Sequence, residues 1–224
     1  MHRLHSKKLL LFDLDGTLVD TKDVIVESFV LASKKTGVKI DPVKVRKLIG
    51  YPLMVVVKNS LLGEYDEDTI NEFIKVRREI MESLWRRKAR LFEDVIPALE
   101  MFSRDGNIIL GIASSSIVQR IIDMVEYFGI KKYFKIISGV KENIRGKPYP
   151  DTILYAIKKA GVGVKDTIYI GDAEIDCIAS RNAGVKFVLV KRENIDLREW
   201  VCRPDYIVES LYELYNLRDK VIYK

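Results

Sequence analysis

The chain has 224 residues, of which 48% are hydrophobic, so it can bury the core of one sizeable domain or of a domain with a smaller insertion. Its 38 Lys and Arg against 32 Asp and Glu give a net charge of +6, which suits anionic small molecules and favours a solvated, ion-paired surface over a nucleic-acid partner. The apolar run at residues 9–12 is too short for a signal peptide, and no run reaches the ~20 residues of a membrane helix, so we expect a soluble cytoplasmic protein without membrane contact.

The first part of the chain combines one strand with a long helical stretch. Residues 9–12 form a continuous apolar run, typical of a strand buried on both faces. No strand-like run interrupts the next stretch, so an all-helical unit is predicted after this strand. Its helices are expected at residues 22–35, 43–49, 53–62 and 69–87.

From about residue 94 the predicted strands and helices alternate, which implies a parallel sheet with helices on both faces. We therefore predict a doubly wound α/β core of residues 1–19 and 90–224, with an inserted helical cap of residues 20–89. Strands are expected at residues 108–113, 135–137, 167–170, 186–190 and 206–208, and helices at 95–102, 118–128, 150–160, 174–183 and 211–217.

The segment Asp13-Leu14-Asp15-Gly16-Thr17 directly follows the first predicted strand. Side chains alternate along a strand, so Asp13 and Asp15 are expected on one side and Leu14 in the core. Two carboxylates this close repel unless a cation or proton lies between them, and Mg²⁺ prefers such oxygen ligands. One carboxylate can attack phosphorus while the other acts as general acid and then base. Taken alone, the segment also fits an ordinary Asp-Gly turn.

Two further segments could hold a phosphoryl group. Ser114 and Ser115 end the strand predicted at residues 108–113, where hydroxyl and backbone N–H groups can bind phosphate oxygens at the start of the next helix. Lys147, flanked by Gly146 and Pro148, precedes another helix and could neutralise a nucleophile and the transferring group. The plainer interpretations are a helix cap and a solvated surface lysine.

A second acidic segment follows the strand predicted at residues 167–170. Asp172 is expected at the strand tip and Asp176 one helical turn later, on the same side. Ligands of open α/β sheets bind beyond the carboxyl ends of the strands, so this pair should face the first acidic pair. The adjacent Cys177 is expected to be a small buried residue, because two cysteines are too few for a disulfide scaffold.

In this order and at these strand ends, the four segments resemble the motifs of the haloacid dehalogenase superfamily. The closest likeness is to its phosphoglycolate-phosphatase-like and β-phosphoglucomutase-like branch, and it covers nearly the whole chain. The resemblance implies a Rossmann-like core, Mg²⁺ as cofactor, Asp13 as nucleophile, and Asp15 as acid and base whose backbone carbonyl also binds the metal. By this resemblance the catalytic residues are Asp13, Asp15 and Lys147, the phosphate-binding residues are Leu14, Thr17, Ser114, Ser115 and Lys147, and the metal ligands are Asp13, Asp15, Asp172 and Asp176.

The resemblance predicts a phosphatase that acts on a small phosphorylated substrate, such as phosphoglycolate or a sugar phosphate. Asp15 argues against dehalogenase and phosphonate-cleaving chemistry, because the members of this superfamily that perform those reactions lack an acid at this position. A sugar phosphomutase is the main alternative, but such enzymes carry an Arg shortly after the cap glycine, and the run at residues 50–54 has none. A non-catalytic phosphate-binding regulatory protein is the other alternative. The sequence leaves a monomer and a homodimer open, and Gly50, Tyr51 and Lys58 are candidate cap contacts to the leaving group.

Overall fold

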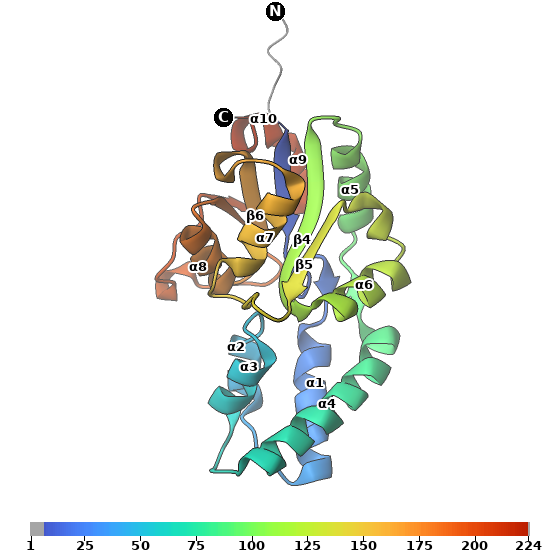
Figure 1. Cartoon of the computed structure of the whole chain (residues 1–224), viewed down its shortest axis with the longest axis vertical. Helices are drawn as coiled ribbons and strands as arrows, with labels where there is room; N and C mark the ends of the chain where they lie inside the picture. The colour runs from blue at the N-terminus through green and yellow to red at the C-terminus, as the bar shows by residue number, and fades with distance from the viewer. Residues whose placement is uncertain (1–6, 224) are drawn as a thin grey trace, which may run out of the picture.

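The computed structural model describes residues 7–223 and has a central six-stranded sheet with helices around it (Figure 1). The strands lie in the order β5-β4-β1-β6-β7-β8, and each neighbouring pair is parallel. The predicted doubly wound α/β fold is therefore confirmed. The strands of this sheet are β1 (Lys8–Phe12), β4 (Ile108–Ile117), β5 (Ile136–Val140), β6 (Thr167–Gly171), β7 (Lys186–Val190) and β8 (Tyr206–Val208).

Alternation along the buried strands divides the apolar side chains between two cores. In β1, Leu10 and Phe12 join one buried cluster, whereas Leu9 and Leu11 join the other. The first cluster is covered by α5 (Val95–Ser103), α6 (Val118–Tyr127) and α9 (Leu211–Asn216), and the second by α7 (Asp151–Ala160) and α8 (Glu174–Ala183). The shorter helices are α10 (Arg218–Val221) and the 3₁₀ helices η1 (Lys131–Tyr133), η2 (Val164–Asp166) and η3 (Leu197–Glu199).

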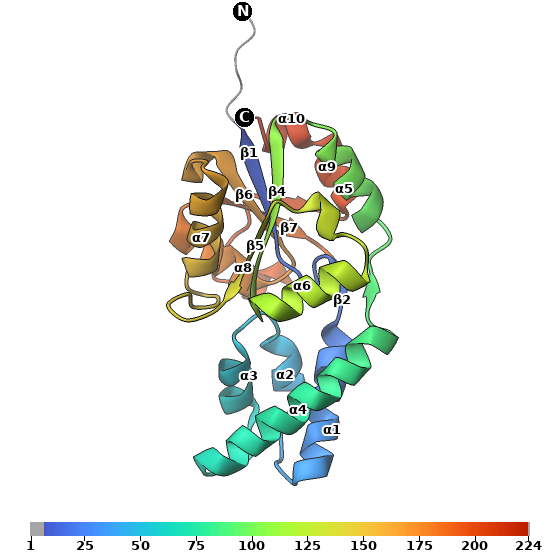
Figure 2. The ribbon, with the colours of Figure 1, turned by 45° about the vertical axis from the view of Figure 1, so that its right-hand side comes forward.

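The remaining four helices form a group beyond one end of the sheet (Figures 1 and 2). The chain leaves the sheet through β2 (Val19–Asp20) and returns through β3 (Arg90–Leu91), and these two short strands pair antiparallel. Within the group, the Phe29 and Phe73 rings pack with centroids 5.9 Å apart, which joins the first and last helices. The four helices are α1 (Lys22–Thr36), α2 (Pro42–Lys47), α3 (Leu53–Ser60) and α4 (Glu67–Lys88).

Two expectations need correction. The strand predicted to end at Ala113 continues to Ile117, with a register shift against β5, so Ser114 and Ser115 lie on the strand extension and not at a helix start. Cys177 is buried as expected, but it forms a disulfide with Cys202 across 25 residues of sequence, which its spacing did not reveal. Within residues 7–223, no helix is both long and apolar enough to cross a membrane.

Candidate active site

The turn after β1 brings the first acidic segment against the second. The Asp13 N–H donates to the Ile170 carbonyl at 2.9 Å, which continues the pairing of β1 with β6, and the chain then turns sharply at Gly16. Gly16 has a φ of +86°, and a Cβ at this position would lie 2.6 Å from Asp172 Oδ2. Only glycine fits this left-handed and crowded position, so the turn requires the residue that the sequence has there.

Three buried carboxylates meet at this edge of the sheet, from Asp13, Asp172 and Asp176, with one oxygen of each within 4.8 Å of the others. Lys147 is fully buried, and its Nζ lies 2.9 Å from Asp13 Oδ1 and 2.5 Å from Asp176 Oδ1. The other oxygen of Asp176 accepts the backbone N–H groups of Asp172 and Ala173. Asp176 therefore anchors both the lysine and the loop that carries Asp172.

The protonation of this cluster follows from burial and charge. Burial raises the pKa of Asp13, and the charges of Asp176 and Asp172 add to that rise, while Lys147 lowers it. Burial raises the pKa of Asp172 as well, and Lys22 offsets part of the increase. Burial lowers the pKa of Lys147, but Asp13 and Asp176 raise it well above the ordinary value, so the ammonium keeps its proton. Asp13 and Asp172 therefore hold a proton more readily than an exposed aspartate, unless a further cation stabilises their ionised forms.

Two oxygens of the cluster suit a metal ion. Among the described residues, Asp13 Oδ1 and Asp172 Oδ2 are buried without a hydrogen-bond partner, and each instead faces a lysine ammonium at 2.9 Å and 2.7 Å. Carboxylate oxygens are the hard ligands that Mg²⁺ and Ca²⁺ prefer. The donor set therefore fits a divalent cation. Asp13 and Asp172 are the better placed side chains, because each has an oxygen that accepts no hydrogen bond, whereas both oxygens of Asp176 accept one.

Asp15 points away from this cluster and into a separate set of contacts. Arg120 of α6 forks onto its carboxylate, with N–O distances of 2.7 Å and 2.9 Å, and the hydroxyls of Ser116 and Thr21 donate to it as well. Burial would raise the pKa of Asp15, but the charge of Arg120 and these hydrogen bonds bring it down to about 2. The two aspartates of the first motif therefore have different neighbours: Asp13 lies in the acidic cluster, and Asp15 contacts Arg120.

The other predicted phosphate-binding residues also lie here. Thr17 Oγ1 donates to Asp172 Oδ1 at 2.7 Å, and Ser115 Oγ accepts the Lys147 N–H at 3.0 Å. Ser114 is buried and its hydroxyl accepts the N–H of Ser116, so it stabilises the strand end. The Leu14 side chain is wholly buried in the core, so only its backbone is available to a ligand.

The family model of the haloacid dehalogenase-like hydrolases matches residues 10–190, which is most of the chain. The chain belongs to this hydrolase family. The predicted superfamily and its phosphoglycolate-phosphatase-like branch are therefore confirmed, and this family generally uses a divalent metal.

Named relatives of this hydrolase are phosphatases. It is 30% identical over 216 residues to phosphoglycolate phosphatase from Agrobacterium fabrum, covering 92% of this chain and 90% of the relative. It is 27% identical to pyrophosphatase PpaX from Oceanobacillus iheyensis, covering 95% of this chain and 97% of that one. A haloacid dehalogenase-like family hydrolase from Streptococcus pneumoniae superposes with a TM-score of 0.79 at 26% identity, covering 95% and 99% of the two chains.

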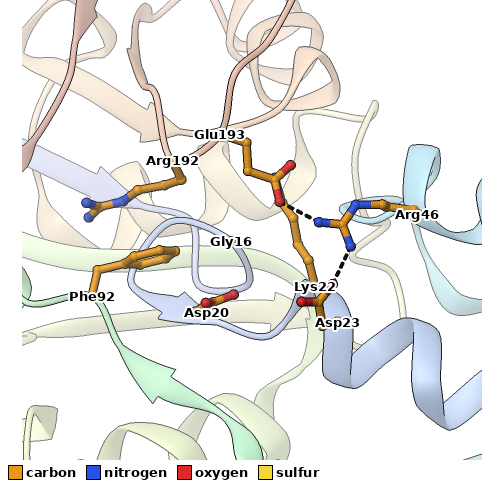
Figure 3. A pocket seen from close by; sticks show the side chains of 8 residues that line it. All are labelled: Gly16, Asp20, Lys22, Asp23, Arg46, Phe92, Arg192 and Glu193. Carbon is orange, nitrogen blue, oxygen red and sulfur yellow. Dashed lines mark hydrogen bonds and ion pairs between the residues drawn. The ribbon is translucent and has the colours of Figure 1, made fainter.

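The hydrolase has supporting residues that sequence reasoning missed. Lys22 pairs with Asp172, and the guanidinium of Arg192 donates to the Thr17 carbonyl at 3.1 Å and 3.0 Å, which fixes the motif turn from the loop after β7. Figure 3 shows the adjacent pocket, where Arg46 of α2 spans from Asp23 to Glu193 of the same loop. In the sequence, the only indication that Lys22 supports the site is its position shortly after the first motif. Nothing in the sequence around Arg192 indicates its role.

Proposed function

We propose that this member of the haloacid dehalogenase-like hydrolases is a Mg²⁺-dependent phosphatase that hydrolyses a small phosphate monoester, such as phosphoglycolate or a sugar phosphate, through an aspartyl-phosphate. The names of its relatives support a phosphatase. The observation that carries the proposal is the placement of Asp13, which faces the Lys147 ammonium at 2.9 Å beside two further buried carboxylates.

In the proposed reaction, a carboxylate oxygen of Asp13 attacks phosphorus and the bond to the leaving oxygen breaks. Because Arg120 holds Asp15 ionised in this structure, Asp15 would have to leave Arg120 and take up a proton before the first step. It then gives this proton to the leaving oxygen, and its carboxylate takes a proton from the water that attacks the aspartyl-phosphate. This second step releases inorganic phosphate and restores Asp13. Lys147 stabilises negative charge on the transferring group, and the hydroxyl and backbone N–H groups at Ser114 and Ser115 orient its oxygens.

The divalent cation would be held by Asp13, Asp172 and the backbone carbonyl of Asp15, with Asp176 supporting them, and would neutralise charge on the phosphoryl oxygens. Mg²⁺ is the proposed ion because such oxygen sets leave room for water and substrate phosphate. The protein itself keeps Lys147 protonated through Asp13 and Asp176, and it holds the Asp15 side chain outside the acidic cluster through Arg120.

We also propose the predicted division into a core of residues 1–19 and 90–224 and a cap of residues 20–89. The antiparallel pair β2–β3 supports this division, because it is where the chain leaves and re-enters the core. The cap would close over the substrate and exclude water.

A cytoplasmic location and a monomeric or homodimeric state remain predictions. The Cys177–Cys202 disulfide argues against a cytoplasmic location, because disulfides are rare in the cytosol outside hyperthermophiles.

The test is release of phosphate from p-nitrophenyl phosphate with Mg²⁺, compared with the same assay in EDTA. Asp13→Asn should abolish turnover, since the amide cannot attack phosphorus, and circular dichroism should report an unchanged fold. Asp205→Asn is the matched control, because Asp205 lies in the loop before β8 and accepts the Phe187 N–H far from the acidic cluster. Wild-type activity in Asp13→Asn, or full activity in EDTA, would overturn the proposal.

A further inference from the structure

Arg192, in the loop after β7, holds the turn of the first motif from outside the acidic cluster. Its Nε and Nη2 both donate to the Thr17 carbonyl, at 3.1 Å and 3.0 Å. Because the guanidinium is planar and rigid, two bonds from it to one carbonyl fix the orientation of that peptide. The position of Thr17 is therefore set by a side chain that lies far away in the sequence.

The guanidinium of Arg192 is itself held by two other contacts. Its Nη1 donates to Asp94 Oδ2 at 2.8 Å, and the same oxygen accepts the Leu211 N–H at 2.7 Å, at the start of α9. The guanidinium carbon lies 4.2 Å from the centroid of the Phe92 ring (Figure 3). The Arg192 side chain is only 6% exposed, so it is fixed between α9, the Phe92 ring and the motif turn.

Thr17 connects Arg192 to a proposed metal ligand. Its hydroxyl donates to Asp172 Oδ1 at 2.7 Å, and Asp172 Oδ2 is then the oxygen without a hydrogen-bond partner. A hydrogen bond to one oxygen of a carboxylate fixes the plane of the group and directs the other oxygen, and such contacts behind metal ligands orient them for binding. A displaced Thr17 would therefore turn the Asp172 carboxylate away from the position that suits a cation.

We propose that Arg192 is a positioning residue for the divalent cation, and that it acts on Asp172 through Thr17. The inference rests on the proposed phosphatase function, because it concerns the cation of that reaction. Arg192 sets how tightly the cation binds and takes no part in the transfer of the phosphoryl group. Asp94 serves the same purpose one step further away, since it holds the third nitrogen of the guanidinium.

The test must separate this role from the stability of a buried ion pair. Arg192→Met in the wild type also leaves Asp94 buried without its cation, which destabilises the protein for a reason unrelated to the metal. The reference protein is therefore Asp94→Asn, because the amide oxygen still accepts the Leu211 N–H and no unpaired carboxylate remains. In this background, Arg192→Met removes the donors to the Thr17 carbonyl, and Thr17→Val removes the hydroxyl that holds Asp172.

Isothermal titration calorimetry with Mg²⁺ alone measures the affinity of each protein, and circular dichroism checks that it is folded. Relative to the reference, Arg192→Met and Thr17→Val should each weaken Mg²⁺ binding about 10- to 100-fold, the usual loss when a residue behind a metal ligand is removed. The two substitutions together should weaken binding no more than one of them, because both break the same connection to Asp172.

Two further variants in the same background complete the comparison. Arg192→Lys should recover part of the Mg²⁺ affinity, because its ammonium can still donate to the Thr17 carbonyl, and it replaces Arg192→Met in the comparison if that variant does not fold. Arg198→Met, in the same loop and with a side chain that is 90% exposed, should bind Mg²⁺ as the reference does. With p-nitrophenyl phosphate, Arg192→Met should need more Mg²⁺ for half-maximal rate but should keep most of its kcat at saturating Mg²⁺.

The outcomes separate this inference from the proposed function. If Arg192→Met binds Mg²⁺ as tightly as the reference and the wild type hydrolyses p-nitrophenyl phosphate, the positioning role is wrong and the phosphatase proposal stands. The same holds if the losses from Arg192→Met and Thr17→Val multiply in the combined variant, because Arg192 then does not act through Thr17. If the wild type neither binds Mg²⁺ nor hydrolyses p-nitrophenyl phosphate, the phosphatase proposal fails and this inference fails with it.

Discussion

The ammonium of Lys22 lies 2.7 Å from Asp172 Oδ2, on one of the two carboxylates best placed to ligate a divalent cation. Lys22 begins α1, so this contact also ties the first helix beyond the sheet to the acidic cluster. A lysine and a metal ion cannot share one carboxylate oxygen at close range without repulsion. Lys22 therefore competes with the metal, and it has an alternative partner in Glu193 at 3.4 Å.

Lys22→Met should accordingly bind Mg²⁺ more tightly than the wild type. We expect the dissociation constant from isothermal titration calorimetry to fall about tenfold, which corresponds to about 1.4 kcal/mol. The matched control is Lys34→Met, at the exposed far end of the same helix, which should leave Mg²⁺ affinity unchanged. An unchanged or weaker affinity in Lys22→Met would show that the lysine does not compete with the metal.

Removal of the buried Lys147 charge should destabilise the protein in the absence of metal. Lys147→Met leaves Asp13 and Asp176 buried without their shared cation, and such a loss typically costs about 3–5 kcal/mol. The free energy of unfolding from urea titration in EDTA measures this cost. Turnover of p-nitrophenyl phosphate should fall as well, because the transferring group loses its cation.

A second substitution separates charge from packing at this site. Lys147→Met with Asp176→Asn should recover a substantial part of the lost unfolding free energy, since one unpaired carboxylate is removed, without recovering activity. If Lys147→Met unfolds in EDTA at the wild-type urea concentration, the ion pairs contribute nothing to stability. If the double variant is no more stable than the single one, the loss comes from packing.

The acidic cluster could be predicted from sequence because its residues follow strands. Asp13 and Asp172 each come directly after a buried apolar run, and parallel strands bring their carboxyl ends to one edge. Lys147 follows no strand, and its prediction depended on family resemblance. Its complete burial became clear only from the fold.

Other features could not be read from sequence for physical reasons. Arg120 lies on a helix, and helical periodicity does not say which neighbouring element a polar face meets. The extension of β4 to Ile117 depends on pairing with Val140, a contact made far along the chain. The pairing of Cys177 with Cys202 depends on how the loop after β7 returns to α8, which cysteine spacing does not encode.

Gly50 is expected to set how closely the helical group approaches the acidic cluster. It has a φ of +101°, and a Cβ there would lie 2.8 Å from Ile175 Cγ2, in the first turn of α8. Gly50→Ala should therefore lower kcat/KM about 10- to 100-fold by displacing the groups around the substrate. Asp176 follows Ile175 and holds Lys147, so a small displacement of this turn would also move the acidic cluster.

The control for Gly50→Ala is Gly37→Ala, which has a similar φ of +78° but open space around its would-be Cβ. Both variants should lose about 1–2 kcal/mol of stability from the left-handed backbone, but only Gly50→Ala should lose activity. Adding Ile175→Ala to Gly50→Ala removes the clashing methyl and should restore part of kcat/KM. Equal activities in the two glycine variants would contradict a role for the Gly50–Ile175 contact.

The disulfide should stabilise the loop that carries Arg192 and Glu193. It links Cys177 of α8 to Cys202 across 25 residues, and closing a loop of this length contributes about 3 kcal/mol in the chain-entropy account. Reduction by dithiothreitol should therefore lower Tm by about 6–12 °C for a protein of this size. The Cys177→Ala/Cys202→Ala double variant should have the lower Tm with or without reductant. If the wild-type Tm is the same in both conditions while thiol titration confirms two free cysteines after reduction, the disulfide does not stabilise the fold.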